Sequence, residues 1–279
     1  MAMKTLLACL MNRENADAVL ACAVPLARAH GAHLIGLHTV EALLVYPGIA
    51  IHVPDATFRS FNESQAEEAK AIETIFERHT ANEDFASEWR LVKAEASTAA
   101  TRMIESAHAA DVVIMPQEDN SVARADQSNA QERVIREGGR PVIIVPTGYE
   151  GAELGSNIVL GWSDTRQAAR AAHDALLVAQ KGCDINILRV ASRKTDEMKD
   201  FDAIDLAAMF DRHGHKAKTT LRERAGDDVA EVLMKQAFEQ GADMIVTGAF
   251  GHTRVYDFVI GAVTHTLLTD AKVPVLFSA

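Results

Sequence analysis

The sequence is poor in cysteine, proline and aromatic residues. Its 279 residues include 3 cysteines, 7 prolines and 5% aromatic side chains, and no apolar run reaches the roughly 20 residues of a membrane-spanning helix. Cys9, Cys22 and Cys183 are odd in number and match no metal-ligand spacing, which excludes a disulfide framework and a cysteine zinc site. We interpret them as small core residues of a cytoplasmic protein. The apolar stretch after Lys4 is too short for a secretory signal.

Positive charge is also scarce. Lys and Arg total 28 against 39 Asp and Glu, a formal net charge of −11, and no basic stripe stands out. A chain of this kind lacks the electrostatic footprint of a nucleic-acid-binding protein and is repelled by anionic lipid. We therefore expect neither nucleic acid nor membrane as a partner. If the protein binds a phosphate, local backbone groups must hold it.

The sequence contains an internal repeat. Three segments recur in the same order, with 27–40 matching 178–191, 109–116 matching 241–248, and 141–146 matching 274–279. The repeat predicts two homologous domains, 1–148 and 155–279, joined by a glycine-bearing linker. The first copy carries about twenty extra residues, which we assign to 41–60. Its segment 43–58 is apolar, irregular and unlike a helix, and covers either the domain interface or a partner site.

Short apolar runs alternate with helical periodicity in each half. In the second half, strands are predicted at 157–162, 185–190, 218–224, 244–248 and 274–278. One helix follows a capping box of Asp164 and Gln167, another is capped by Asp227, and the helix at 194–214 packs through an apolar face that includes Met198, Phe201, Ile204, Leu206, Met209 and Phe210. This alternation predicts an α/β fold, with a five-stranded, parallel, doubly wound sheet in each half. Such sheets bind ligands beyond the carboxyl ends of their strands.

One loop of the second half carries a chemical signal. Residues 248–268 place Gly248, Gly251 and Gly261 before a predicted helix, so that backbone can approach a ligand closely. The first amide groups of that helix, at 262–264, have no hydrogen-bond partner within the helix and lie at the positive end of its dipole. Phosphate is the ligand that this geometry suits, although the same glycines could shape a tight turn and nothing more.

The spacing resembles the G-x2-G-x9-G-[S/T] nucleotide loop of the universal stress protein family. The segments 162–176, 241–248 and 274–278 are similar to that family's first helix, fourth strand and fifth strand. The resemblance covers essentially the whole chain and is closest over 157–279. It implies two tandem domains packed as a pseudo-dimer through their last strands, a role in stress response, and ATP or AMP as ligand, with or without Mg²⁺.

The resemblance also implies particular roles. It puts Gly248, Gly251 and Gly261 around the phosphates and ribose. The amides of Ala262, Val263 and Thr264, with the Thr264 hydroxyl, would bind phosphate oxygens. Trp162, Ser163 and Val190 would lie near the adenine, and His252 either contacts phosphate or faces solvent.

Two residues depart from the family pattern. Ser163 replaces the usual aspartate, and Ala262 replaces the serine or threonine after the third glycine. A hydrogen bond to a charged group contributes about 1.5–3 kcal/mol, so the loss of the hydroxyl weakens binding roughly ten- to a hundredfold, while the Ala262 amide remains.

The first half differs at the equivalent stretch. Residues 116–132 contain no glycine, and they carry four carboxylates, Glu118, Asp119, Asp126 and Glu132. Negative charge opposes a bound anion there, although these side chains could equally form a plain solvated loop. We expect one nucleotide site per chain, in the second half, with the first half as its partner domain.

Enzyme and metal signals are weak. The sequence has no G-x-S-x-G elbow and no G-x-x-x-x-G-K-[S/T] loop, so at most slow ATP hydrolysis is expected. The histidines, grouped as His30, His33 and His38 and as His213 and His215, keep no ligand spacing with a carboxylate or cysteine, and we predict no metal site.

The sequence therefore predicts a regulatory, stress-related protein that binds adenine nucleotide in its C-terminal domain. The alternative is a nucleotide-independent interaction or chaperone-like module whose pockets have decayed, which Ser163 and Ala262 favour. The particular stress, the protein partner and a homodimer beyond the internal pair all stay open.

Overall fold

The computed structural model describes residues 3–41, 55–94, 98–118, 129–151, 154–191, 201–251 and 261–279. The first half contains β1 (Thr5–Cys9), α1 (Arg13–His30), β2 (His33–Glu41), α3 (Asp55–Thr80), β3 (Ser87–Ala94), α4 (Ala99–Ala107), β4 (Val112–Pro116), α5 (Ala130–Glu137) and β5 (Val142–Val145). The second half repeats this order with β6 (Asn157–Trp162), α6 (Arg166–Val178), β7 (Asp184–Ala191), α7 (Phe201–Arg212), β8 (Lys216–Glu223), α8 (Val229–Glu239), β9 (Met244–Gly248), α9 (Ala262–Asp270) and β10 (Val275–Ser278).

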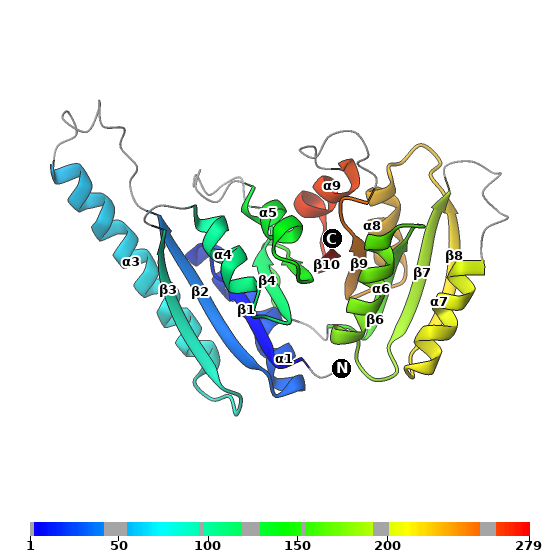
Figure 1. Cartoon of the computed structure of the whole chain (residues 1–279), viewed down its shortest axis with the longest axis horizontal. Helices are drawn as coiled ribbons and strands as arrows, with labels where there is room; N and C mark the ends of the chain where they lie inside the picture. The colour runs from blue at the N-terminus through cyan, green and yellow to red at the C-terminus, as the bar shows by residue number, and fades with distance from the viewer. Residues whose placement is uncertain are drawn as a thin grey trace.

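The ten strands form one sheet in the order β3-β2-β1-β4-β5-β10-β9-β6-β7-β8. Neighbours within each half are parallel, whereas β5 and β10 pair antiparallel, with Leu276 opposite Ile143. The predicted fold class is therefore confirmed, and so is the packing through the last strands, which joins two five-stranded sheets into a continuous one. Figure 1 shows the two halves meeting at the centre, where β10 and the C-terminus lie.

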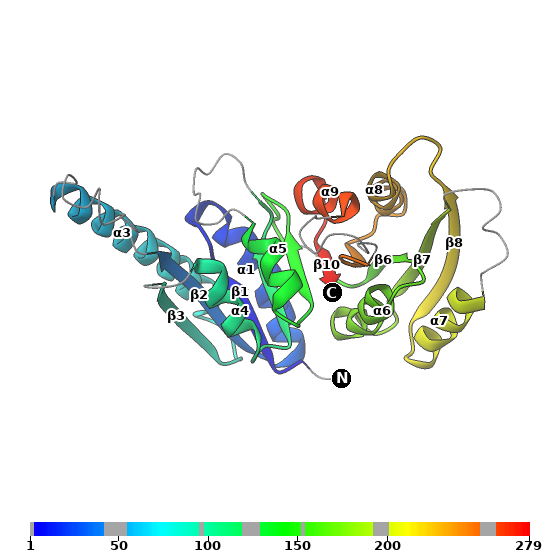
Figure 2. The ribbon, with the colours of Figure 1, turned by 45° about the horizontal axis from the view of Figure 1, so that its top comes forward.

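Apolar side chains cover both faces of this sheet. Helices α1, α3, α6 and α7 contribute buried residues to the core on one face, and α4, α5, α8 and α9 contribute to the core on the other. Each core contains residues from both halves, so the halves bury a shared apolar surface. Figure 2 shows α5 of the first half beside α9 of the second at their junction.

The extra length of the first half lies partly in α3. This helix has 26 residues, against 12 in its counterpart α7, and its buried residues Ala69, Ile72 and Phe76 all lie in its second half. Its first half extends beyond the sheet (Figure 1). The prediction of an irregular segment at 43–58 is wrong for 55–58, which begin α3, and the rest of that segment lies outside the described residues.

Two predicted helix caps are wrong by one residue. Thr165, not Asp164, caps α6, because its extended backbone lets its hydroxyl accept from the Ala168 amide at 3.2 Å. Asp228, not Asp227, caps α8 and forms a capping box with Glu231, with hydrogen bonds of 2.8 and 2.7 Å. In both cases two cap-forming residues stand side by side, and only the backbone conformation selects between them.

Other differences are local. β8 begins at Lys216, two residues before the predicted start. Ile204 is 58% exposed, against the prediction that it packs, because only one face of α7 meets the sheet, whereas Leu206 and Phe210 are buried. Met198 lies outside the described residues.

The three cysteines are free and buried, as predicted. Burial raises the pKa of each thiol to about 12. Among the described helices, none combines the length and the apolar character needed to cross a lipid bilayer.

Candidate functional site

A cavity of about 400 Å³ opens at the carboxyl ends of β6, β7 and β9. The strand order reverses between β6 and β9, so the helices that follow these strands leave toward opposite faces of the sheet. A crevice forms at such a point, and it is where open α/β sheets bind ligands.

The cavity has an apolar part and a polar part. Its apolar side chains are Trp162, Leu188, Val190, Val229, Leu233, Phe250 and Val263. Its polar groups are the hydroxyls of Ser163, Thr165, Thr247 and Thr264, together with the backbone of the glycines. No carboxylate is among its described lining residues, so an anion meets no negative side chain there.

Nine of the ten residues predicted for the site line this one cavity. They are Trp162, Ser163, Val190, Gly248, Gly251, Gly261, Ala262, Val263 and Thr264. The tenth, His252, lies outside the described residues. Residues separated by as many as 102 positions in the sequence, from Trp162 to Thr264, are thus brought together by strand pairing.

The three glycines have different physical roles. A Cβ atom on Gly248 would lie 2.6 Å from the Ala168 amide nitrogen, so only glycine lets β9 approach α6 this closely. A Cβ atom on Gly251 would lie 3.2 Å from the Thr165 hydroxyl oxygen. At Gly261 an added Cβ would meet nothing within 4 Å, because that position faces open space. Gly261 is therefore free of any packing requirement within the described part of the chain.

The start of α9 presents backbone donors. Gly261 is its N-cap and offers no side chain, and the first intrahelical hydrogen bond runs from the His265 amide to the Gly261 carbonyl at 3.1 Å. Within the described residues, no acceptor faces the amides of Ala262, Val263 and Thr264. Such amides at the positive end of a helix dipole favour an anion. The Thr264 side chain is buried beside them.

Several lining residues were not predicted. Thr165, Leu188, Val229, Leu233 and Phe250 contact the same space. Thr165 could have been found as the alternative cap to Asp164. Val229 and Leu233 come from α8, whose apolar face carried no sign that its first turns border a cavity rather than the core.

The first half has a different arrangement at the equivalent place. Glu132 occupies the repeat position of Thr264, in the first turn of α5, where a helix dipole favours a carboxylate. Its carboxylate lies 2.7 Å from Arg136 and is only 14% exposed, so it is not simply solvated. Gln131 donates to the Pro116 carbonyl at 3.2 Å. Glu118 is half-buried, whereas Asp119 and Asp126 lie outside the described residues.

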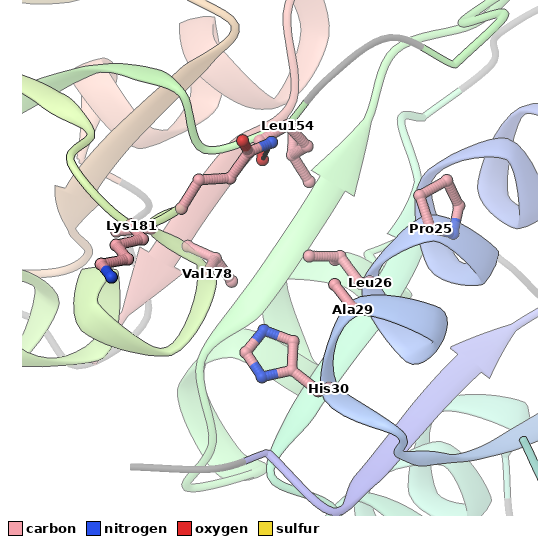
Figure 3. A pocket seen from close by; sticks show the side chains of 9 residues that line it. Pro25, Leu26, Ala29, His30, Leu154, Val178 and Lys181 are labelled. Carbon is pink, nitrogen blue, oxygen red and sulfur yellow. Dashed lines mark hydrogen bonds between the residues drawn. The ribbon is translucent and has the colours of Figure 1, made fainter.

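A larger cavity, of about 570 Å³, lies between the halves at the other end of the strands. Figure 3 shows its apolar side chains Leu26, Leu154 and Val178, with His30 and Lys181 beside them. Burial lowers the pKa of His30, which favours the neutral imidazole. This cavity has no glycine among its lining residues and lies at the amino ends of the strands, away from the switch points.

One histidine of the first half, His38, serves packing. His38 is fully buried, its Nδ1 lies 2.7 Å from the Leu10 carbonyl, and its ring stacks on Trp89 with centroids 6.4 Å apart. Across the described ranges, no three His, Cys, Asp or Glu side chains gather as a metal site would require.

Comparisons with known proteins agree with this architecture. The model of the universal stress protein family matches residues 3–146 and again residues 156–278. Similar solved structures include a universal stress protein from Archaeoglobus fulgidus DSM 4304, with a TM-score of 0.71 and 14% identity over 98% of this chain and 97% of that chain. A structure described as a putative universal stress protein, from Pseudomonas aeruginosa UCBPP-PA14, has a TM-score of 0.59 and 12% identity over 99% of this chain and 93% of that chain.

A universal stress protein from Archaeoglobus fulgidus in complex with dAMP is similar to 52% of this chain, over 99% of its own length, with 16% identity and a TM-score of 0.32. No curated protein matches the sequence. The two family matches together span nearly all of the sequence, one in each half of the sheet, and the chain belongs to the universal stress protein family.

Proposed function

We propose that the second half binds an adenine nucleotide, ATP or AMP, and that the bound nucleotide regulates the protein. The observation that carries this proposal is the convergence of three glycines and the open α9 amides on one cavity. The apolar side chains, among them Trp162, Val190 and Leu233, suit a purine base. The α9 amides suit phosphate oxygens.

A regulatory role fits the chemistry of the cavity better than turnover does. Its described lining residues include no His, Lys, Asp or Glu that could act as a general base or bind a metal. We propose that the first half binds no nucleotide, because the Glu132 carboxylate stands at the helix terminus where a phosphate would otherwise lie.

The experiment is a calorimetric titration of the full chain with Mg-ATP and with AMP, alongside Gly261→Val. The Gly261 backbone, with φ −62° and ψ 135°, is one that valine adopts, and the added side chain enters open space. We expect one site per chain in the wild type, no binding by the variant, and stability within about 1 kcal/mol of wild type, the scale of a helix cap.

A second variant is expected to strengthen nucleotide binding. Ala262 is exposed at the first position of α9, so Ala262→Ser adds a hydroxyl beside the open amides without disturbing the core. We expect affinity to rise by about tenfold, the value of one hydrogen bond to a charged group. No heat with either nucleotide, and none released from the denatured protein, would instead support the nucleotide-independent interaction module.

A further inference from the structure

Phe250 occupies an unusual place in the cavity. It lies two residues beyond the end of β9 and has φ 61°, in the left-handed region that residues with a side chain rarely adopt. A non-glycine residue keeps this conformation only when its surroundings hold it. Because Phe250 lines the cavity, whatever holds its ring also shapes the site.

The neighbours of Phe250 in the chain are anchored within the second half. The Ala249 amide donates to the Ser278 carbonyl at 2.7 Å, which ties the turn to β10. Gly251 packs closely against Thr165, at the start of α6. These contacts fix the two sides of the turn, but neither reaches the phenyl ring between them.

The ring is contacted from the first half of the chain. The guanidinium carbon of Arg136, on α5, lies 4.6 Å from the Phe250 ring centroid, which is a cation–π distance. Arg136 is itself oriented by Glu132, one turn earlier on α5, at 2.7 Å. The Glu132 carboxylate, the Arg136 guanidinium and the Phe250 ring therefore form a chain of contacts from one half to the cavity of the other.

We propose that Arg136 is a positioning residue for the second-half cavity. By holding the Phe250 ring, it keeps the turn at 249–251 in the conformation that lines the site. The first half thus completes a binding site that belongs to the second. Its effect on nucleotide affinity rests on the proposed function, whereas its effect on the turn does not.

The test compares Arg136→Ala with Arg133→Ala in the full chain. Arg133 is the control, because it lies on the same helix, has similar exposure and pairs with Glu137 at 3.2 Å, and its other hydrogen bonds, to Thr98 and Thr101, stay within the first half. The first readout is amide hydrogen exchange of residues 249–251 without nucleotide. The second is the affinity for Mg-ATP and AMP.

We expect Arg136→Ala to speed exchange at 249–251 and to weaken nucleotide binding by about two- to tenfold, as a lost cation–π contact implies, while Arg133→Ala changes neither. Arg136→Lys keeps a cation near the ring and should restore part of both. In a Phe250→Leu background, which lacks the π face, Arg136→Ala should have no further effect.

Exchange in Arg136→Ala that equals exchange in Arg133→Ala would overturn the positioning role. If Arg136→Ala sped amide exchange at 249–251 but left the affinity for both nucleotides unchanged, Arg136 would hold the turn without influencing nucleotide binding. If the wild type binds neither nucleotide, the proposed function fails, and the exchange measurement still decides whether Arg136 holds the turn.

Discussion

Gly248 and Gly261 belong to the same loop signature, but a side chain would have different consequences at each. At Gly248 the constraint comes from the fold, because the backbone of Gln167 and Ala168 leaves no room for a Cβ atom. At Gly261 an added Cβ atom meets nothing within 4 Å among the described residues, so the proposed nucleotide is what a side chain there would obstruct. We therefore expect substitution of Gly248 to change stability and substitution of Gly261 to change binding.

Gly248→Ala should lower the free energy of unfolding by about 1–3 kcal/mol, the usual cost of forcing an extra carbon into a packed site. The added Cβ would lie 2.6 Å from backbone atoms of α6, which cannot turn away as a side chain could. Urea denaturation measures the change, with Gly261→Ala as the matched control. Equal stability of the two variants would contradict this interpretation of the packing.

At the scale of elements, a repeated aspartate anchors the first strand of each half. The Asp111 carboxylate accepts from the amides of Lys4 and Thr5 at 2.6 and 2.9 Å, at the start of β1. Its repeat partner Asp243 accepts from the amides of Gly155, Ser156 and Asn157 at 2.7–2.9 Å, and from the Ser156 hydroxyl at 2.5 Å. Each aspartate stands just before a central strand and fixes where the neighbouring strand begins.

Asp243→Asn should lower the free energy of unfolding by about 2 kcal/mol, because hydrogen bonds to a charged group are lost and one amide donor is left facing other donors. Asp111→Asn should cost less, since that carboxylate accepts from two amides rather than three amides and a hydroxyl. Chemical denaturation of both variants provides the comparison. If Asp111→Asn lowered the free energy of unfolding more than Asp243→Asn does, the number of donors would not explain the cost.

At the scale of the molecule, the halves are joined by more than the pairing of β5 with β10. The Gln117 side chain donates to the Ala271 carbonyl at 3.3 Å across the junction, and both cores continue through it. Asp174, on α6, also lies at this junction. The Ser278 hydroxyl donates to it at 2.8 Å, and Arg140 of the first half and Arg170 and His173 of its own helix act on it electrostatically.

Burial raises the pKa of Asp174 above its ordinary value of 3.8, more than its hydrogen bond and positive neighbours lower it. Between 3.8 and the raised pKa, the folded state binds the extra proton, so this group makes the protein less stable as pH rises through that window. Asp174→Asn should therefore be more stable than wild type at neutral pH, and the advantage should vanish below pH 3.8. Thermal unfolding across this range is the measurement, and a pH-independent difference would contradict it.

Much of the architecture follows from local patterns. The repeat and the apolar strands predicted two parallel five-stranded halves, and the resemblance carried by the glycine spacing predicted nine lining residues of the cavity. Helix caps were less predictable, because Asp164 and Thr165 differ only in a backbone conformation that the sequence leaves open. The exposure of Ile204 was equally hard to predict, because helical periodicity indicates which residues share a face of a helix but not whether another element covers that face.

The sequence by itself determined the family, the fold of each half and the loop that bears the candidate site, because glycine spacing and hydrophobic periodicity are local and survive in a linear pattern. Only the tertiary structure decided which distant groups meet at the cavity: Val229 and Leu233 from α8, and Arg136 from the other half through Phe250. Those contacts depend on strand order and on the antiparallel pairing of β5 with β10. Packing across the junction places residues side by side that are more than a hundred positions apart, and no local pattern encodes that proximity.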